Sequence, residues 1–318
     1  MSQQQDNLKT HHEVLKLMGS RFEITAISEK EALAVQAVKA GIDEIRRIEK
    51  LISSWDPASQ TSEVNRQAGI KPVAVDQELF DLINRAKKIS TLTDGAFDIS
   101  YASMDKIWKF DGSMKTLPDP DLVKNSVARI DFKNIMLDPE KGTVFLKEKG
   151  MKIGFGAIGK GYAANKAKSI MLSLGIQNGL VNAGGDLIAW GKKADGSDWQ
   201  IGIANPKDKE GIFSWLTINE MAVVTSGDYE RFVMFDGKRY AHIIDPRTGY
   251  PVSETKSVTI ICPDAELADA LATSVFVLGE KQGLNLINQL KGIECLIVNK
   301  DDEIKTSDNL DLNYYRKK

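Results

Sequence analysis

The alternation of hydrophobic and polar positions along the chain predicts many β-strands. In residues 16–28, Phe22, Ile24 and Ala26 alternate with polar neighbours, which is typical of a strand with one buried face. Asp-Gly-Lys at 236–238 lies inside another such run and predicts a hairpin turn. Further strands are expected within residues 143–147, 151–155, 179–191, 199–206, 214–227, 231–245, 257–262 and 294–300.

Apolar residues that recur every three to four positions predict several helices. Ser28, followed three residues later by Glu31, is expected to open the first helix as a capping box. Gly175 is expected to end a later one. Because helices dominate early and antiparallel strands dominate late, we expect an α+β fold and not a doubly wound parallel sheet. The predicted helices begin near Ser28, Asp76 and Gly159, and two more cover about 264–278 and 280–290.

The composition is that of an ordinary globular protein. The chain has 318 residues, of which 42% are hydrophobic and 27% charged, with a formal net charge of −2. The chain has no excess of basic residues that would indicate a nucleic-acid partner. No apolar run is long enough to span a bilayer, and the first residues lack the features of a signal peptide. Cys262 and Cys295 lack a metal-binding spacing, so we expect buried, reduced thiols.

A glycine-rich segment, "GFGAIGKG", leads into the helix predicted from Gly159. Backbone N–H groups at such a helix start attract phosphate groups. The segment departs from both familiar nucleotide-binding patterns, because the nearest acidic residue downstream is Asp186 and because Gly161 follows Lys160 where a P-loop has Ser or Thr. Two interpretations stay open: a phosphate-facing loop with a cation at Lys160, or glycines that only permit tight packing.

Asp269 and Thr273 lie four residues apart in a predicted helix, so their side chains share one face. A carboxylate beside a hydroxyl offers the hard oxygen ligands that Mg²⁺ prefers. The simpler interpretation is a solvated polar face, and the spacing does not decide between the two.

The stretch "YAHIIDPRTGYPV" (240–252) carries His242 at the end of a β-rich run. The other two histidines, at 11–12, lie in a polar N-terminal segment, so His242 is expected to be the one imidazole of the folded body. Thr-Ser-Gly at 225–227 ends a strand near it. Each feature alone fits a structural histidine or a solvated turn. Together with the glycine-rich segment and the Asp–Thr pair, they suggest phosphate chemistry with a divalent metal.

The chain resembles the ApbE-type FAD:protein FMN transferases, formerly called thiamine-biosynthesis lipoproteins. The resemblance is carried, in order, by "MGSRFEIT", "DGAFDIS", "GAIGKGYAANKA", "LVNAGGDL", "TSGDYERF", "HIIDPRTGYPV" and "ADALATSVFVLG". It implies a T-fold-like α+β structure of antiparallel sheets with packed helices, and an FAD site in a cleft between two halves. It also implies Mg²⁺-dependent cleavage of FAD, with FMN passing to a Ser or Thr hydroxyl of an acceptor protein and AMP released.

The resemblance assigns roles to individual residues. His242 matches the family's histidine beside the scissile diphosphate and is expected to be catalytic. Asp269, Thr273 and the backbone carbonyl of Ala157 are expected to bind the metal. The residues expected to contact FAD are Met18, Trp55, Ala96, Phe97, Asp98, Gly154, Lys160, Ser226, Gly227 and Ile243.

Two of these positions depart from the family pattern. Gly154 replaces a frequently acidic residue, and Trp55 stands where many members have Tyr. An aromatic side chain at 55 can stack on a flavin or adenine ring. Two alternatives to FMN transfer therefore stay open: Mg²⁺-dependent hydrolysis of FAD to FMN and AMP, and non-catalytic binding or storage of FAD.

The polar segment 1–12 is expected to be a flexible leader, with residues 13–318 forming a single domain or two intimately packed subdomains. Because members of the resembled family are usually exported and often lipid-anchored, we expect a periplasmic or other extracytoplasmic location, with a lipid anchor in a longer precursor. The expected acceptor is a subunit of a redox-driven membrane complex or a similar protein, and no nucleic-acid partner is expected.

Overall fold

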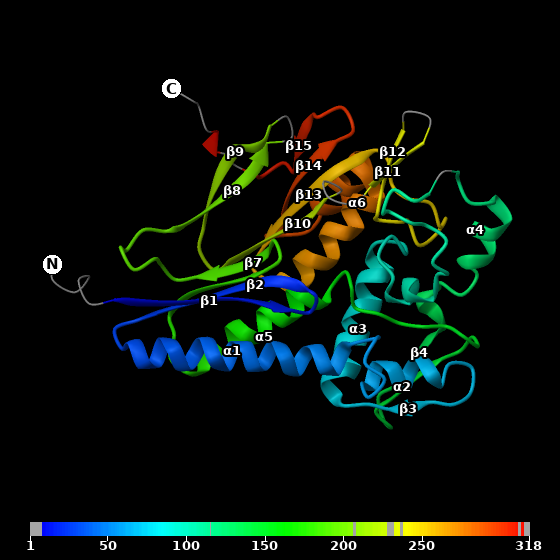
Figure 1. The fold of residues 1–318 in the computed structure, drawn as a ribbon, viewed down its shortest axis with the longest axis horizontal. Coiled ribbons are helices and arrows are strands. Elements are labelled where there is room, and N and C mark those ends of the chain that lie inside the picture. Colours follow the sequence, from blue (N-terminus) through cyan, green and yellow to red (C-terminus); the bar gives the residue numbers. More distant parts are fainter. Residues whose placement is uncertain are drawn as a thin grey trace.

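The centre of the protein is an eight-stranded sheet in which all neighbouring strands are antiparallel (Figure 1). The computed structural model describes residues 8–114, 116–205, 208–227, 232–235, 238–310 and 313–314. In order across the sheet, the strands are β1 (Lys9–Leu17), β2 (Ser20–Ser28), β6 (Asn178–Ala183), β7 (Asp186–Trp190), β10 (Met221–Gly227), β13 (Thr255–Cys262), β14 (Glu294–Asn299) and β15 (Ile304–Thr306).

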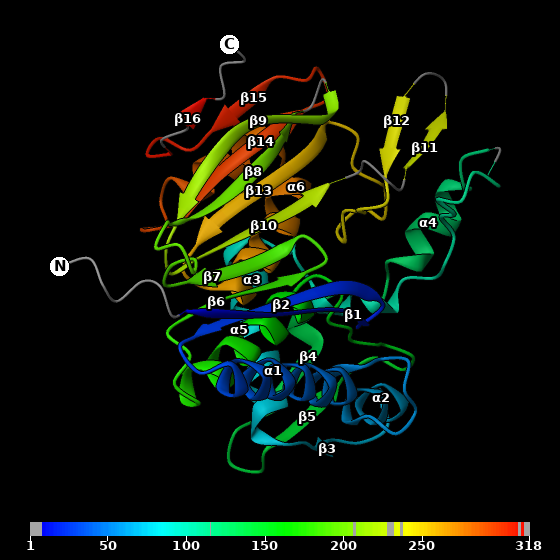
Figure 2. The ribbon, with the colours of Figure 1, turned by 60° about the vertical axis from the view of Figure 1, so that its left-hand side comes forward.

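Both faces of this sheet are covered, because successive side chains of a strand point to opposite faces. In β10, Ala222 and Val224 pack in the core under the helices, whereas Val223 between them packs toward a second pair of strands (Figure 2). The helices on the first face are α1 (Glu31–Ile52), α5 (Gly159–Ser173) and α6 (Ala265–Ile287), and the strands on the other are β8 (Trp199–Asn205) and β9 (Asp208–Ile218).

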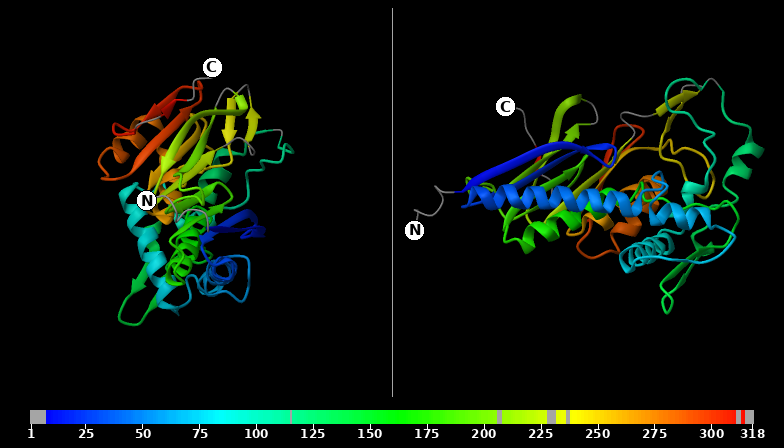
Figure 3. Two further views of the ribbon diagram at one scale, coloured as in Figure 1. Left: turned by 90° about the vertical axis from the view of Figure 1, so that its left-hand side faces the viewer. Right: turned by 60° about the horizontal axis from the view of Figure 1, so that its bottom comes forward.

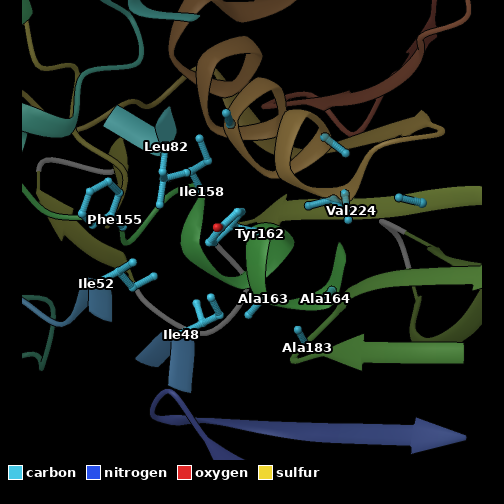
Figure 4. Packing of buried hydrophobic residues seen from close by; sticks show 14 of the residues in the cluster. Ile48, Ile52, Leu82, Phe155, Ile158, Tyr162, Ala163, Ala164, Ala183 and Val224 are labelled. Carbon is cyan, nitrogen blue, oxygen red and sulfur yellow. The ribbon is translucent and has the colours of Figure 1, made fainter. Parts of the chain in front are cut away.

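Helix α5 packs between α1 and α6, and its first turn is in close contact with both (Figure 4). Figure 3 shows the same helices from two further sides. A Cβ on Gly161 would lie 2.0 Å from the carbonyl oxygen of Ala265 in α6, so glycine is required there. Ile48 and Ile52 of α1, together with Ile158, are buried around the same turn (Figure 4). The sequence therefore fixes the position of the N-terminus of α5 against both neighbouring helices.

Most of the remaining elements lie beyond one end of the sheet (Figure 1), whereas β16 (Asn313–Tyr314) pairs with β9. Trp108 stacks on Tyr240 at a ring distance of 6.5 Å and donates from Nε1 to the carbonyl of Gly249 at 2.8 Å. We call the region held together by these contacts the outer lobe (residues 101–114, 116–127, 232–235, 238–241 and 244–251). The remaining elements are α2 (Gln60–Arg66), β3 (Val73–Ala74), α3 (Gln77–Leu92), η1 (Ile99–Ser103), α4 (Pro120–Ser126), η2 (Phe132–Asn134), β4 (Ile135–Asp138), β5 (Thr143–Leu146), β11 (Phe232–Phe235), β12 (Lys238–Ala241) and β16 (Asn313–Tyr314).

The structure confirms the α+β class and the predicted helices near Asp76 and Gly159. Gly175 has φ 92°, as the predicted end of α5 requires. The two late helices are also present as the two parts of α6, which is kinked at Gly279 with φ 74°. The hairpin predicted at 236–238 is confirmed by the pairing of β11 with β12, although its turn residues 236–237 lie outside the described residues.

Three expectations were wrong. Residues 9–12 belong to β1 and pair with β2, so a flexible leader cannot extend to residue 12. Ser28 does not cap the first helix: α1 begins at Glu31 without a side-chain cap, and the Ser28 hydroxyl accepts from the amide of Lys30 at 3.2 Å. Residues 151–155 form no strand, because they lead as an extended loop into α5.

No helix among the described residues combines the length and the apolar character that a membrane crossing would need.

Candidate active site

A cavity of about 830 Å³ opens where the end of β10, the first turn of α5 and the middle of α6 meet the outer lobe. This volume is within the usual range for small-molecule and cofactor sites. The cavity brings together residues from distant parts of the chain and confirms a cleft between two halves of the molecule. The predicted site residues that line it are Trp55, Ala96, Phe97, Asp98, Gly154, Ala157, Lys160, Ser226, Gly227, His242, Ile243, Asp269 and Thr273.

At the inner end of the cavity, the carboxylate of Asp269 meets the first turn of α5. The amide of Gly161 donates to Asp269 Oδ2 at 3.0 Å. In a continuous helix this amide would instead donate to the carbonyl of Ala157, four residues earlier. No described residue donates a hydrogen bond to that carbonyl, which lies at the cavity wall. The glycine-rich segment therefore allows tight packing and, at the same time, leaves one backbone oxygen for a ligand.

Three charged side chains are clustered at this inner end. The ammonium of Lys160 is paired with the carboxylate of Asp186, the first residue of β7, which is almost fully buried. Burial and, to a smaller extent, the neighbouring carboxylate of Asp186 together raise the pKa of Asp269 to about 7. Burial also raises the pKa of Asp186. It disfavours the charged form of Lys160, but the two carboxylates outweigh this effect and raise its pKa.

The predicted metal ligands fit a hard divalent cation. With both carboxylates ionised, one ammonium leaves an unbalanced negative charge in a buried place, which a cation would neutralise. The donor set is a carboxylate of Asp269, the hydroxyl of Thr273 and the unbonded carbonyl of Ala157, all at the cavity wall. Among the described residues, no three His, Cys, Asp or Glu side chains cluster around a possible metal, so a softer, nitrogen- or sulfur-rich site is not indicated there.

Hydroxyl groups and an imidazole lie next to this charged cluster. The Oγ of Ser226 is 3.5 Å from the Oγ1 of Thr273, which connects the end of β10 with α6. His242 lines the same cavity. It is not the one imidazole of the folded body, because His12 lies in β1 with Nδ1 2.9 Å from Thr25 Oγ1. The structure nevertheless places only His242, among the described histidines, at the cavity wall.

Another part of the cavity wall carries aromatic side chains. Trp55, in the loop after α1, is 79% exposed. The ammonium of Lys106 lies over its indole at 4.6 Å from the ring centroid, a cation–π contact. Ala96 and Phe97 are buried and line the cavity with their neighbours. This wall therefore offers apolar and π surface to a planar ring.

The structure shows the surroundings of three residues that are predicted to contact FAD: Asp98, Gly154 and Met18. The Asp98 carboxylate accepts from the amide and hydroxyl of Ser100, both at 2.7 Å, and from the amide of Phe132 at 2.8 Å, so it organises the loop. Gly154 donates its amide to Ile99, and a Cβ there would lie 3.1 Å from the Cβ of Ala102. Met18 lies in the β1–β2 turn and is not among the residues that line the cavity, although its side chain reaches the first turn of α5, where Cε lies 3.6 Å from the Cβ position of Gly159; its contact with FAD stays a prediction.

Asp186 is the functional candidate that the sequence analysis missed. It was named there only as the nearest acidic residue downstream of the glycine-rich segment, at a spacing that fits no familiar nucleotide-binding pattern. Its signal was a single carboxylate at the start of an otherwise apolar strand, "DLIAW", directly after the Gly-Gly turn between β6 and β7. Such a carboxylate must find a partner when it is buried, and Lys160 supplies it.

The fold and the site together define an α+β protein whose cavity suits a large phosphorylated ligand with an aromatic ring. The sequence model of the ApbE family matches residues 18–297. The chain therefore belongs to the ApbE family, as the sequence motifs predict.

Named relatives and solved structures agree with this assignment. The chain is 34% identical to an FAD:protein FMN transferase of Klebsiella pneumoniae, covering 91% of this chain and 89% of the relative. It is 32% identical to one of Treponema pallidum, covering 92% and 85%. The crystal structure of an ApbE protein from Thermotoga maritima matches with TM-score 0.85 and 33% identity, covering 94% and 97%. The flavin transferase ApbE from Vibrio cholerae matches with TM-score 0.84 and 25% identity, covering 95% and 98%.

Proposed function

We propose that this protein transfers FMN from FAD to a Ser or Thr hydroxyl of an acceptor protein and releases AMP. The observation that carries the proposal is the meeting of His242, Lys160, Asp269 and Thr273 in one cavity of a chain from the ApbE family. In the reaction, the acceptor oxygen forms a bond to the FMN phosphorus and the bond from that phosphorus to the bridging oxygen breaks. AMP leaves with that oxygen, and the hydroxyl proton is passed to a base.

His242 is the base that we assign to the acceptor hydroxyl. It lines the cavity and follows directly on β12, so the backbone of the hairpin positions it. A neutral imidazole can accept a proton near neutral pH, and such general-base assistance typically contributes ~10²–10⁴-fold to the rate. No other described imidazole lines the cavity.

Lys160 and the two buried carboxylates hold the charged end of the substrate site. Asp186 keeps the ammonium of Lys160 at the cavity wall, where it can contact a diphosphate. Asp269, Thr273 and the carbonyl of Ala157 would hold Mg²⁺, the proposed cofactor. When bound, Mg²⁺ withdraws negative charge from a diphosphate. The exposed indole of Trp55 is assigned to stacking on one of the two rings of FAD.

The proposed acceptor is a subunit of a redox-driven membrane complex, and the proposed location is the extracytoplasmic side of the membrane, with a lipid anchor on a longer precursor. The family resemblance supports both. Fractionation of cells that produce the native gene product tests the location. Recovery in the cytosolic fraction alone would contradict it.

Flavin fluorescence of the acceptor after denaturing electrophoresis tests the transfer. A candidate acceptor is incubated with the protein, FAD and Mg²⁺, and parallel samples receive EDTA or an acceptor whose target Thr is replaced by Ala. We expect a fluorescent acceptor band in the complete sample alone. A complete sample without the band, in which FAD has been converted to free FMN and AMP, would identify a pyrophosphatase. Unchanged FAD that stays bound would identify a storage protein.

A further inference from the structure

The outer lobe contains a β-strand with an open edge close to the cavity. β11 and β12 form a sheet of two strands, and no further strand pairs with β11 among the described residues (Figure 2). β12 ends at Ala241, and the next residue is His242. The hairpin therefore connects an open strand edge with the proposed catalytic residue.

The pairing register shows which backbone groups of β11 point to the open edge. Phe232 lies opposite Ala241, and Met234 lies opposite Arg239. The amide of Ala241 donates to the carbonyl of Val252 at 2.9 Å, on the side of β12 away from β11. In an antiparallel pair, the N–H and C=O of one residue point to the same side, and this side alternates along the strand. The N–H and C=O groups of Phe232 and Met234 therefore point away from β12, toward the open edge.

The same two residues expose their side chains. Phe232 is 36% and Met234 is 53% exposed, whereas Val233 between them is buried. The guanidinium of Arg239 lies over the ring of Phe232, 3.8 Å from its centroid. An edge strand with exposed apolar side chains is a template for pairing with another chain, and proteins usually protect such edges. Here the edge is unprotected among the described residues, next to the site where an acceptor must arrive.

We propose that the open edge of β11 binds the acceptor, which adds an extended segment to the hairpin as a third strand. Backbone hydrogen bonds to Phe232 and Met234 would hold the segment, and its apolar side chains would pack on the same two residues. The proposal rests on the transferase function proposed above. The occupant is the acceptor and not a second copy of this chain, because the Phe232 end of the edge is level with the end of β12, where His242 follows.

The geometry also places the hydroxyl that is modified. The added strand would lie two strand spacings from β12, about 10 Å. Extended chain covers about 3.3 Å per residue, so roughly three residues span that distance. The modified Ser or Thr therefore lies about three residues beyond the last paired residue of the acceptor segment.

The first experiment measures amide hydrogen exchange in the wild-type protein. The probe is the peptide that the protein flavinylates fastest in a library of random peptides with one fixed Thr, with that Thr then replaced by Ala to prevent turnover. At saturating peptide, with FAD and Mg²⁺ present, we expect slower exchange at the amides of Phe232 and Met234. The amides of Val233 and Phe235 point toward β12 and should change little. Unchanged exchange at Phe232 and Met234 would overturn the proposal.

The second experiment separates the edge from the rest of the site. Met234→Pro removes one outward amide and leaves the hairpin ladder its hydrogen bonds. We expect the KM for the Thr peptide to rise about tenfold, which corresponds to the loss of a hydrogen bond. The affinity for FAD should not change. Met234→Leu keeps the amide and an apolar side chain, so its KM should rise far less than that of Met234→Pro. Met136→Ala removes a comparably exposed methionine from β4 and should leave the KM as in the wild type.

Three outcomes are decisive against the proposal. Wild-type KM in Met234→Pro would place the acceptor elsewhere. Dimerisation of the wild type that Met234→Pro abolishes, with transfer unaffected, would assign the edge to a second copy. If the wild type flavinylates no peptide of the library and no protein acceptor, the transferase function is refuted, and this proposal is refuted with it. That outcome differs from a wild-type KM in Met234→Pro, which would refute the role of the edge alone.

Discussion

The inner and outer walls of the cavity are built in different ways. The inner wall consists of side chains on the main sheet and on two packed helices: Asp186 on β7, Lys160 on α5 and Asp269 on α6 are all held by buried neighbours. The outer wall is formed by loops and the outer lobe, and its prominent side chain, Trp55, is 79% exposed. Substitutions on the inner wall should therefore change chemistry and folding together, whereas those on the outer wall should change only binding.

The largest effect is expected at the boundary between the two walls. His242→Ala removes the proposed base, so the rate of FMN transfer should fall by ~10²–10⁴-fold while FAD still binds. Single-turnover AMP release and FAD titration measure the two quantities. His12→Ala is the matched control, because it removes an imidazole that contacts Thr25 in the sheet. Turnover in His242→Ala equal to that of the His12→Ala control would exclude the assigned role.

Asp269→Asn tests the charge of the inner wall. It keeps the shape of the side chain but removes the anionic ligand, so we expect transfer to fall by ~10²-fold and the Mg²⁺ concentration for half-maximal rate to rise. The measurement is the rate of AMP release against Mg²⁺ concentration. Asp195→Asn, in an exposed turn, should leave the curve in place. Superimposable curves for Asp269→Asn and wild type would show that Asp269 does not bind the metal.

Gly161→Ala tests whether the inner wall depends on close helix packing. The added Cβ would lie 2.0 Å from a backbone oxygen of α6, so the helices must separate, and we expect the free energy of unfolding to fall by about 1–3 kcal/mol. The control is Gly156→Ala, because nothing lies within 4 Å of a Cβ there. Urea unfolding of both variants measures the difference. Equal midpoints would show that the first turn of α5 can move freely.

The smallest effect is expected on the outer wall. Trp55→Ala should lower the affinity for FAD by the value of an aromatic stack, about 0.5–1.5 kcal/mol, which is roughly 2–13-fold. The maximal transfer rate should stay the same, because the role assigned to the indole is ring stacking and not a part in breaking the bond. Trp55→Tyr keeps an aromatic ring and should keep the affinity. A lower maximal rate with unchanged affinity for FAD would show that Trp55 acts in the chemical step and not in FAD binding.

The sequence predicted the residues that line the cavity better than the packing contacts that hold them in place. Alternation and helical spacing predicted the sheet strands and α5, because both depend on burial of one face. The motifs predicted that His242, Asp269 and Thr273 share one site, and the structure places all three at the wall of one cavity. Asp186 and the close approach at Gly161 depend on contacts between residues 26 and 104 positions apart, and no local pattern contains them. Ser28 was misassigned because its hydroxyl bonds the amide of Lys30 in a turn, which competes with capping.

The ratio of AMP released to FMN bound covalently tests the central claim most directly. Wild-type protein is incubated with FAD, Mg²⁺ and a Thr-containing acceptor, and both products are quantified by chromatography and mass spectrometry of the acceptor. If the inner wall breaks the diphosphate only for an incoming hydroxyl, the two products form in equal amounts and AMP is absent when the acceptor is withheld. AMP formed at the same rate without an acceptor would contradict the transferase account.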